Sequence, residues 1–482
     1  MTIRRLGAPW AAPGDRQYSL PTSLMVKLAL GEAPEHVPAV RDVVRGARTA
    51  ASSIDGGAVD RVIGERAGTF RAARLFSAAG GAHRPGRGHV GYDAVEQATG
   101  VARTLILRVP SGTPVGQLCE TLAQIPIVES AGPDYVSVTP FHAAAAGAPD
   151  GDDGWAARRM VRMAEAHAVE PGDDGVVVGL VDSGISSRHA EFPRTFRAGF
   201  DTVRLETADV AAGVELLGDH RRDDGDPEDR FVGHGMGCAG IIAAEGHAMP
   251  RGLGGACRII PMRALAAARL PGKTAAIGLG SLSDLDLAVK LVVDLGAKVI
   301  TMSFGTDDTA LAPSSPKPHA DVVRYALERG CVLVAASGNN GRETRYWPAA
   351  HPGVIAVGAV AGNGLPAAFS TRGEHVALCA PGEQVLTTAL GNGYQYATGT
   401  SFAAPFAAGA AALLVAHSHR RARPIDAETV RRILMRTAQP FAAGDQAGCG
   451  AGVLDAAAAL AALDEELDSA LGNQEAGDAD DG

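Results

Sequence analysis

Short, almost continuous apolar runs that end in glycine-rich turns constrain the fold of this chain most. One such run covers residues 175–182, and another covers residues 331–336. Runs of this kind are typical of parallel strands that are buried on both faces. Amphipathic helical patterns alternate with the strands, for example over residues 285–295, where Gly296 ends the pattern. The alternation predicts an α/β domain with a mostly parallel sheet.

A serine at the start of a small-residue helix is the first candidate for chemistry. Residues 399–405 read Gly-Thr-Ser-Phe-Ala-Ala-Pro and lead from a strand-like stretch into an Ala- and Gly-rich helix. The first turn of a helix has unpaired N–H groups and a positive dipole end, which favour negative charge. Ser401 could therefore attack a carbonyl and hold the oxyanion that forms. The alternative is a serine that only caps the helix.

Asp182 and His234 are the candidate partners of this serine. Asp182 ends the first apolar run, at the place where open α/β sheets carry their sites, although a turn-forming Asp before glycine is an equal alternative. His234 lies between two glycines, which let the backbone pass close to another element. The alternative for His234 is an ordinary surface or core histidine. His189 is a weaker candidate for the base, because it lies in a polar turn without such glycines.

Asn339 is the candidate for stabilising an oxyanion. It follows the apolar run of residues 331–336 in the turn Ser337-Gly338-Asn339. Its amide N–H₂ group could donate to a developing oxyanion together with the backbone N–H of Ser401. The alternative is an ordinary Asn-Gly turn.

The order Asp182, His234, Ser401, each in its own glycine-bounded context, resembles the subtilisin-like serine proteases (subtilases). The resemblance covers roughly residues 155–462. It implies a doubly wound, subtilisin-like α/β fold and a serine endopeptidase that works through an acyl-enzyme intermediate. His234 would then be the general base, Asp182 would orient it, and Asn339 would form the oxyanion hole.

The resemblance also implies a set of substrate-binding residues in the strands beside the site. These are Ser303, Phe304, Gly305, Ser337 and Gly338.

The resemblance implies chemistry without a cofactor. Subtilases often bind calcium, but residues 245–250 are shorter than the common calcium loop, and Ala377 stands where a ligating Asp often lies. Hard cations need several oxygen ligands. We therefore expect no metal in the reaction and no high-affinity calcium at either place. Calcium binding is possible, but the sequence does not indicate it.

The chain divides into four expected regions. Residues 1–141 form an N-terminal propeptide-like or accessory domain, 142–154 an exposed linker, 155–463 the subtilisin-like catalytic domain, and 464–482 an acidic, disordered tail. The strand–helix–strand pattern over residues 104–135 resembles the end of a subtilase propeptide, a small α+β chaperone and inhibitor. We therefore expect self-cleavage within about residues 135–155 and inhibition by the N-terminal fragment; the alternative is an unrelated accessory domain.

Composition limits the partners. The net charge of −10 argues against a nucleic-acid partner. No apolar run approaches the roughly 20 residues of a membrane span, so no membrane partner is expected. The N-terminus lacks the apolar region of a signal peptide, which predicts a cytoplasmic protein, although secretion by another route stays open. Six cysteines without metal-binding spacing predict buried thiols.

The expected partners are a peptide or protein substrate and the chain's own N-terminal region as an inhibitor. Two alternatives to a general endopeptidase stay open, a protease dedicated to one precursor peptide and a silent relative that only binds peptides. An acidic run before His234 suggests a preference for Lys or Arg in the substrate, and the alternative is a solvated loop. The run contains Asp223, Asp224, Asp226, Glu228 and Asp229.

Overall fold

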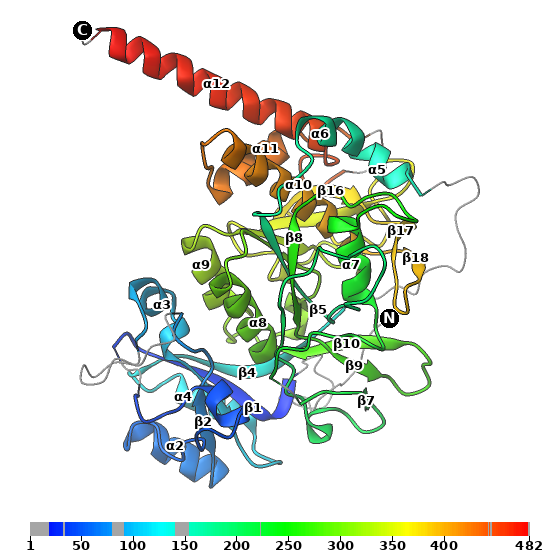
Figure 1. The fold of residues 1–482 in the computed structure, drawn as a ribbon. Helices are drawn as coiled ribbons and strands as arrows, with labels where there is room; N and C mark the ends of the chain where they lie inside the picture. Colours follow the sequence, from blue (N-terminus) through cyan, green and yellow to red (C-terminus); the bar gives the residue numbers. More distant parts are fainter. Residues whose placement is uncertain are drawn as a thin grey trace.

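A seven-stranded parallel sheet forms the centre of the molecule (Figure 1). The computed structural model describes residues 19–31, 34–79, 91–139, 154–221, 223–441, 443 and 446–480, and their side chains up to residue 469. The strand order is β16-β15-β13-β11-β5-β8-β6, and every neighbouring pair is parallel. The strands are β5 Val177–Asp182, β6 Phe200–Asp201, β8 Arg258–Arg263, β11 Val299–Met302, β13 Val332–Ala336, β15 Ile355–Val360 and β16 Val376–Pro381.

Helices cover both faces of this sheet, because its side chains alternate between two cores. Val178 and Leu180 of β5 face the core that contains α7, α10, α11 and the start of α12. Val177 and Val181 face the core that contains α8 and α9. The doubly wound α/β fold expected from the sequence is therefore confirmed. The helices are α7 His234–Ala243, α8 Leu282–Asp294, α9 Ala320–Glu328, α10 Thr400–Arg420, α11 Ala427–Arg436 and α12 Ala456–Asp480.

Helix α10 is longer and more apolar than expected. By length and composition alone it could cross a membrane, contrary to the expectation that no segment reaches that length. Its most apolar 18-residue window is entirely buried inside the domain, so α10 is the central core helix.

The N-terminal region forms a smaller α+β unit. Its antiparallel strands lie in the order β2-β3-β1-β4, and helices α2 and α4 pack on them. The edge strand β4 pairs with β10, so the sheet continues through β9 to β7 of the catalytic region. The elements are β1 Ser19–Leu28, α1 Val40–Val44, α2 Ala58–Ala67, β2 Arg71–Arg74, α3 Ala94–Thr99, η1 Val101–Arg103, β3 Thr104–Arg108, α4 Val115–Leu122, β4 Val128–Val138, β7 Glu215–Leu217, β9 Ala266–Arg269 and β10 Ala276–Ser281.

Short elements complete the described part of the chain, and the predicted linker lies outside it apart from Gly154. The prediction of a disordered tail from residue 464 is wrong for its first part, because α12 continues through it. Asp464 and Glu466 form ion pairs with Arg421 and Arg432 at 2.5 and 2.7 Å. The short elements are α5 Ala156–Met160, α6 Met163–Val169, η2 Thr207–Asp209, β12 Thr306–Asp307, η3 Asp308–Ala310, β14 Tyr346–Trp347, β17 Val385–Thr388 and β18 Tyr394–Ala397.

Candidate active site

The structure brings Asp182 and His234 into direct contact. Asp182 ends β5 at the carboxyl edge of the parallel sheet, and His234 is the first residue of α7. Nδ1 of His234 lies 2.8 Å from Oδ1 and 3.0 Å from Oδ2 of Asp182, and both side chains are fully buried. Because a carboxylate only accepts hydrogen bonds, Nδ1 carries the proton of the neutral ring. Nε2 is then the nitrogen that can accept a proton.

Ser401 lies in the first turn of α10, the helix that packs against α7. Its hydroxyl donates to the carbonyl oxygen of Ser303 at 3.3 Å, and Ser303 Oγ donates back to the Ser401 carbonyl at 2.9 Å. Cys238 Sγ donates to the same carbonyl at 3.4 Å and lies 4.0 Å from Nδ1 of His234. The ring of Phe402 lies 5.2 Å from the His234 ring. Cys238 and Phe402 therefore join the two segments that carry His234 and Ser401.

Cys238 lies beside the histidine, four residues after it in α7. Burial raises the pKa of this thiol well above its usual range, so it stays protonated and is a poor nucleophile. In the part of the chain that the structure describes, the potential metal ligands of Asp182, His234 and Cys238 lie within 4.8 Å of one another. A protonated thiol and a protonated Nδ1 do not suit a cation, which binds deprotonated donors.

The amide group of Asn339 is held beside Ser401. Its Oδ1 accepts hydrogen bonds from the backbone N–H and the hydroxyl of Thr400, each at 2.9 Å. Thr400 directly precedes Ser401, so these two bonds fix the orientation of the amide plane. The N–H₂ group lies on the other side of the amide carbon from Oδ1, away from Thr400. These bonds tether Asn339 to the residue that precedes Ser401, and its role as an oxyanion donor stays a prediction.

The five expected substrate-binding residues have different surroundings. The Phe304 ring is buried in the core with α8 and α9 and lies 5.5 Å from the His319 ring, so only its backbone is left for substrate contacts. Ser337 Oγ donates to the carbonyl of Thr371 at 3.1 Å, and the Gly338 N–H donates to Thr400 Oγ1 at 3.2 Å. Substrate contacts by these residues stay predictions.

An extended segment of the N-terminal region lies beside the site, next to Gly305. β4 pairs antiparallel with β10, with Val138 opposite Leu279, and Val138 also forms an antiparallel bridge with Gly305. β10 was missed by sequence reasoning. The sequence signal for this strand is the alternation of Gly278 and Gly280 with apolar residues. Glycine at position 278 leaves room for the N-terminal region, because a Cβ there would lie 3.0 Å from Cγ2 of Thr139.

His189, the weaker candidate for the base, is used elsewhere. Its Nε2 contacts the carbonyl of Gly393 at 2.9 Å, and its Nδ1 accepts the N–H of Glu191 at 3.2 Å. The neighbouring Glu191 carboxylate accepts three backbone N–H groups, those of residues 246–248, at 2.7–2.9 Å. Burial alone would raise the pKa of Glu191, but these bonds and the Tyr394 hydroxyl lower it. The loop over residues 245–250 therefore surrounds a carboxylate with N–H donors.

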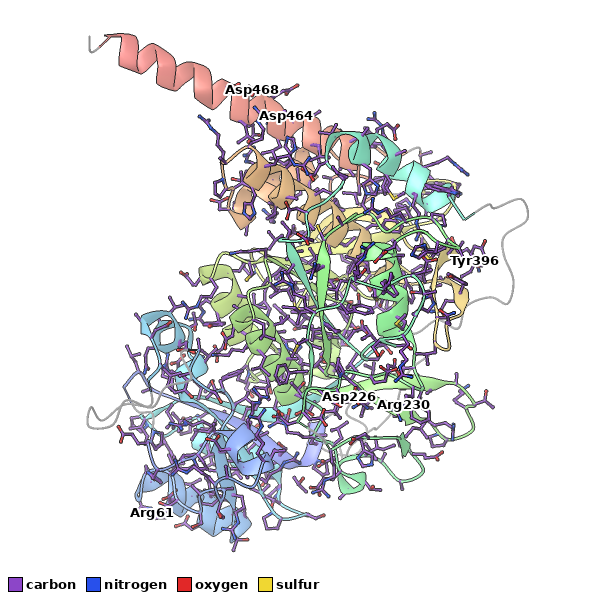
Figure 2. All side chains as sticks on the ribbon, in the orientation of Figure 1. Arg61, Asp226, Arg230, Tyr396, Asp464 and Asp468 are labelled. Atoms are coloured by element: carbon purple, nitrogen blue, oxygen red, sulfur yellow. The ribbon has the colours of Figure 1, made fainter. Side chains whose placement is uncertain are left out.

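The acidic run before His234 is only partly exposed. Asp226, labelled in Figure 2, is exposed, as is Arg230 beside it. Asp223 is buried and pairs with Arg41 of the N-terminal region at 2.9 Å. Asp229 is buried and accepts local hydrogen bonds. The hypothesis of five carboxylates facing a substrate is therefore wrong for two of them.

Comparisons with known proteins agree with this architecture. The model of the Subtilase family matches residues 173–464. The chain is 36% identical over 250 residues to the thermophilic serine proteinase of Bacillus sp. strain AK1. The matched residues make up 51% of this chain and 53% of that protein. It is 31% identical over 288 residues to subtilisin DY of Bacillus licheniformis, and the matched residues make up 59% of this chain and 90% of that protein. The match thus spans about half the length of the first relative.

Two solved structures resemble this one. A protease of Pseudoalteromonas arctica PAMC 21717 is 26% identical with a TM-score of 0.53, and the match covers 66% of this chain and 98% of that one. The Prenylagaramide maturation protease PagA is 26% identical with a TM-score of 0.51, and the match covers 62% of this chain and 98% of that one.

Proposed function

This chain belongs to the subtilase family, and on that premise we propose that it is a serine endopeptidase that uses Asp182, His234 and Ser401. The observation that carries the proposal is the buried hydrogen bond between Asp182 and Nδ1 of His234, next to the helix start that holds Ser401. Nε2 of His234 takes the hydroxyl proton as Ser401 attacks the peptide carbonyl, and later gives it to the leaving amine. Asp182 keeps the ring in the required tautomer and stabilises its cation.

The oxyanion of the tetrahedral intermediate needs fixed donors. Asn339 supplies its N–H₂ group, whose orientation is set by the two hydrogen bonds that its Oδ1 accepts from Thr400, and Ser401 supplies its backbone N–H at the positive end of α10. Because these donors are already oriented, they cost no reorganisation when charge develops.

The direct test is to treat the wild type and Ser401→Ala with an active-site serine probe and to measure hydrolysis of a peptide amide. We expect one label on wild-type Ser401 and loss of both labelling and hydrolysis in the variant. Hydrolysis that persists in Ser401→Ala would refute the assignment. A wild type that binds peptides without reacting with the probe would instead support a silent relative.

The N-terminal region is a candidate inhibitor of this site in the intact chain. β4 occupies the space between β10 and Gly305, where it pairs with both as an extended peptide would. Cleavage near or after the end of this strand, within about residues 135–155, would leave an N-terminal fragment bound beside the site. Most of that segment lies outside the described residues.

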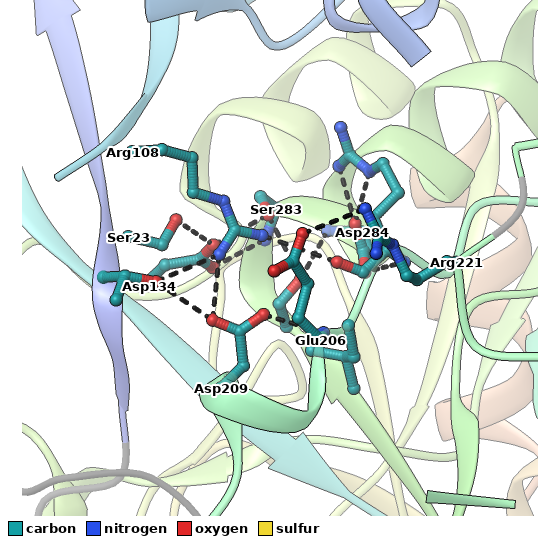
Figure 3. A network of polar contacts seen from close by, with 12 residues as sticks. Ser23, Arg108, Asp134, Glu206, Asp209, Arg221, Ser283 and Asp284 are labelled. Carbon is teal, nitrogen blue, oxygen red and sulfur yellow. Dashed lines mark hydrogen bonds and ion pairs between the residues drawn. The ribbon is translucent and has the colours of Figure 1, made fainter. Parts of the chain in front are cut away.

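Polar contacts support a specific dock for this region (Figure 3). Arg108 of β3 pairs with Asp209 at 2.9 Å. Asp134 of β4 accepts the N–H of Ser283 at 3.0 Å and its hydroxyl at 2.8 Å, at the start of α8, and also the hydroxyl of Ser23 at 2.9 Å. The hydrogen bonds from Ser283 favour the charged form of Asp134 and so offset part of the cost of burying its carboxyl group.

Mass spectrometry of the purified wild type and Ser401→Ala tests self-cleavage. We expect a cut in the wild type and an intact variant. A fully active wild type that stays full length would favour a permanent accessory domain.

A protease dedicated to the maturation of one precursor is the second candidate. The resemblance to PagA, whose name describes a maturation protease, favours it. Digestion of an unfolded protein mixture beside a panel of precursor peptides separates the two: many cuts support a general endopeptidase, and cuts in one precursor alone support a dedicated enzyme.

We propose that no cofactor takes part. The donors of residues 246–248 point at Glu191, a geometry that suits an anion and opposes a cation, and the apolar side chain of Ala377 is buried in β16. The substrate is a peptide or protein, with the N-terminal region as the internal partner.

A further inference from the structure

A buried carboxylate that the proposed reaction does not use lies just before the histidine. This carboxylate belongs to Asp229, a residue that is only 3% exposed. Its Oδ1 accepts the N–H groups of Phe231 and Val232, each at 2.9 Å, and its Oδ2 accepts the N–H of Gly233 at 2.7 Å. A buried carboxylate needs such donors to offset its lost hydration. These bonds fold the segment that leads directly into His234.

The remaining partner of Asp229 comes from the other half of the site. Ser183, which directly follows Asp182, donates its hydroxyl to Oδ2 of Asp229 at 2.7 Å. The same hydroxyl oxygen accepts the N–H of Gly235 at 3.0 Å, and Gly235 directly follows His234. The chain Asp229–Ser183–Gly235 thus joins the residues adjacent to Asp182 and His234.

We propose that Asp229, acting through the hydroxyl of Ser183, is a positioning residue that sets the Asp182–His234 hydrogen bond. This inference rests on the proposed function. Neither residue reaches the reacting atoms in the proposed mechanism, and their effect passes through the two side chains that do.

Close packing makes His234 sensitive to this link. A Cβ at position 235 would lie 2.1 Å from the carbonyl oxygen of Gly184 and 3.3 Å from Cβ of Asp182. The start of α7 therefore packs in direct contact with the turn after β5. The backbone N–H of Ser183 also donates to Oδ1 of Asp182 at 2.7 Å. A change at Ser183 therefore shifts the carboxylate and the imidazole relative to each other.

The expected effect is on turnover. A displacement of about 1 Å in a catalytic constellation can cost about 10²-fold in rate. We expect Ser183→Ala and Asp229→Asn to lower kcat by about 10- to 100-fold, with KM changed by less than about twofold, because neither residue contributes to uniform substrate binding. Ser183→Thr keeps the hydroxyl and should restore most of kcat.

Two readouts separate positioning from a merely structural role. The acid limb of the pH profile of kcat/KM reports the pKa of the essential base in the free enzyme. A weaker bond to Asp182 stabilises the imidazolium less, so this limb should move to lower pH in Ser183→Ala. The hydrogen-bonded Nδ1 proton of His234 should also shift in the ¹H NMR spectrum, and this readout does not depend on hydrolysis.

The experiment uses the full chain and a neutral peptide amide, with enzyme concentrations set by active-site titration so that misfolded protein does not lower kcat. Asp173→Asn is the matched control, since Asp173 is an exposed carboxylate that accepts a local backbone N–H, that of Gly175, just before the amino end of β5. We expect the control to keep the wild-type kcat, pH profile and Nδ1 resonance.

The inference is overturned if Ser183→Ala and Asp229→Asn keep kcat within about twofold of the wild type. It is also overturned if they lose activity with an unchanged pH limb and an unchanged Nδ1 resonance, or if Ser183→Thr is as slow as Ser183→Ala. A wild type that does not hydrolyse peptides refutes the proposed function. The Nδ1 resonances then still decide whether Ser183 and Asp229 set the Asp182–His234 bond.

Discussion

A buried ion pair holds the N-terminal region on the catalytic region, and removing its cation should loosen that dock. Lys290 of α8 donates to Glu96 of α3, to the carbonyl of Ser77 and to Asp294, each at 2.7 Å. The side chains of Lys290 and Glu96 are each 1% exposed. Lys290→Ala leaves the Glu96 carboxylate buried without its cation, and such a loss costs about 3–5 kcal/mol.

The same two regions share an exposed pair that serves as the matched control. Arg329 pairs with Asp93, and the two side chains are 29% and 46% exposed. Exposed pairs contribute about 0–1 kcal/mol. Arg329→Ala should therefore weaken the dock far less than Lys290→Ala.

Hydrogen exchange of the full chain in a Ser401→Ala background, where self-cleavage is blocked, measures the difference. Amides of β4 and β10 that exchange when the dock opens should exchange about 140- to 3,700-fold faster in Lys290→Ala, since about 1.4 kcal/mol corresponds to a factor of ten. Equal exchange in Lys290→Ala and Arg329→Ala would show that the buried pair does not hold the dock.

Three further predictions follow from the same structure. Asn339→Ala should lower kcat by about 10²–10³-fold with little change in KM, because the donor acts on the transition state; a change confined to KM would make Asn339 a turn residue. Burial raises the pKa of Asp134 to about 6, so the docked form binds this proton more tightly than the open form. Its contribution is present at low pH and is lost as pH rises through about 6. Exchange of β4 amides, corrected for the intrinsic rate, should therefore be faster at pH 7 than at pH 5, and Asp134→Asn should abolish this difference. Chelation with EDTA should leave Tm unchanged, whereas Glu191→Gln should cost about 1.5–3 kcal/mol of unfolding free energy; a fall in Tm on chelation would reveal a structural cation.

The arrangement around the candidate site follows from local sequence rules. Asp182 ends an apolar run, and the carboxyl ends of parallel strands lie along one edge of a sheet. His234 and Ser401 each lie in the first turn of a helix that follows glycine, and the 5.2 Å between the rings of His234 and Phe402 shows that the two helix starts lie side by side. These features are local in the chain, and motif reasoning could therefore identify the residues. The core environment of Phe304 was not predictable, since it depends on helices α8 and α9 that pack from elsewhere.

All six cysteines are free and buried in the structure, as the sequence predicts. Cys379 and Cys449 are neighbours in one core cluster, where Sγ of Cys379 donates to the Cys449 carbonyl at 3.2 Å, and both are thiols. The cytoplasmic location stays a prediction. Cell fractionation of the native protein would test it.

Charge runs are where sequence reasoning failed, and both failures have the same physical cause. Composition shows how many carboxylates a segment carries but not which donors surround them. Asp223 pairs with Arg41, 182 residues earlier in the chain, and so is buried instead of facing a substrate.

The C-terminal segment repeats this situation. It has no basic residue of its own after position 463, which suggested disorder. The cations come from the end of α10 and from α11, where Arg432 and Arg436 both reach Glu466, at 2.7 and 2.8 Å. Pairing across two helices, added to the burial of Leu460 and Leu463 against the core, offsets the entropy of ordering this turn of α12. The acidic segment is therefore ordered where Leu467 packs on the core and the arginines of the neighbouring helices lie beside its carboxylates.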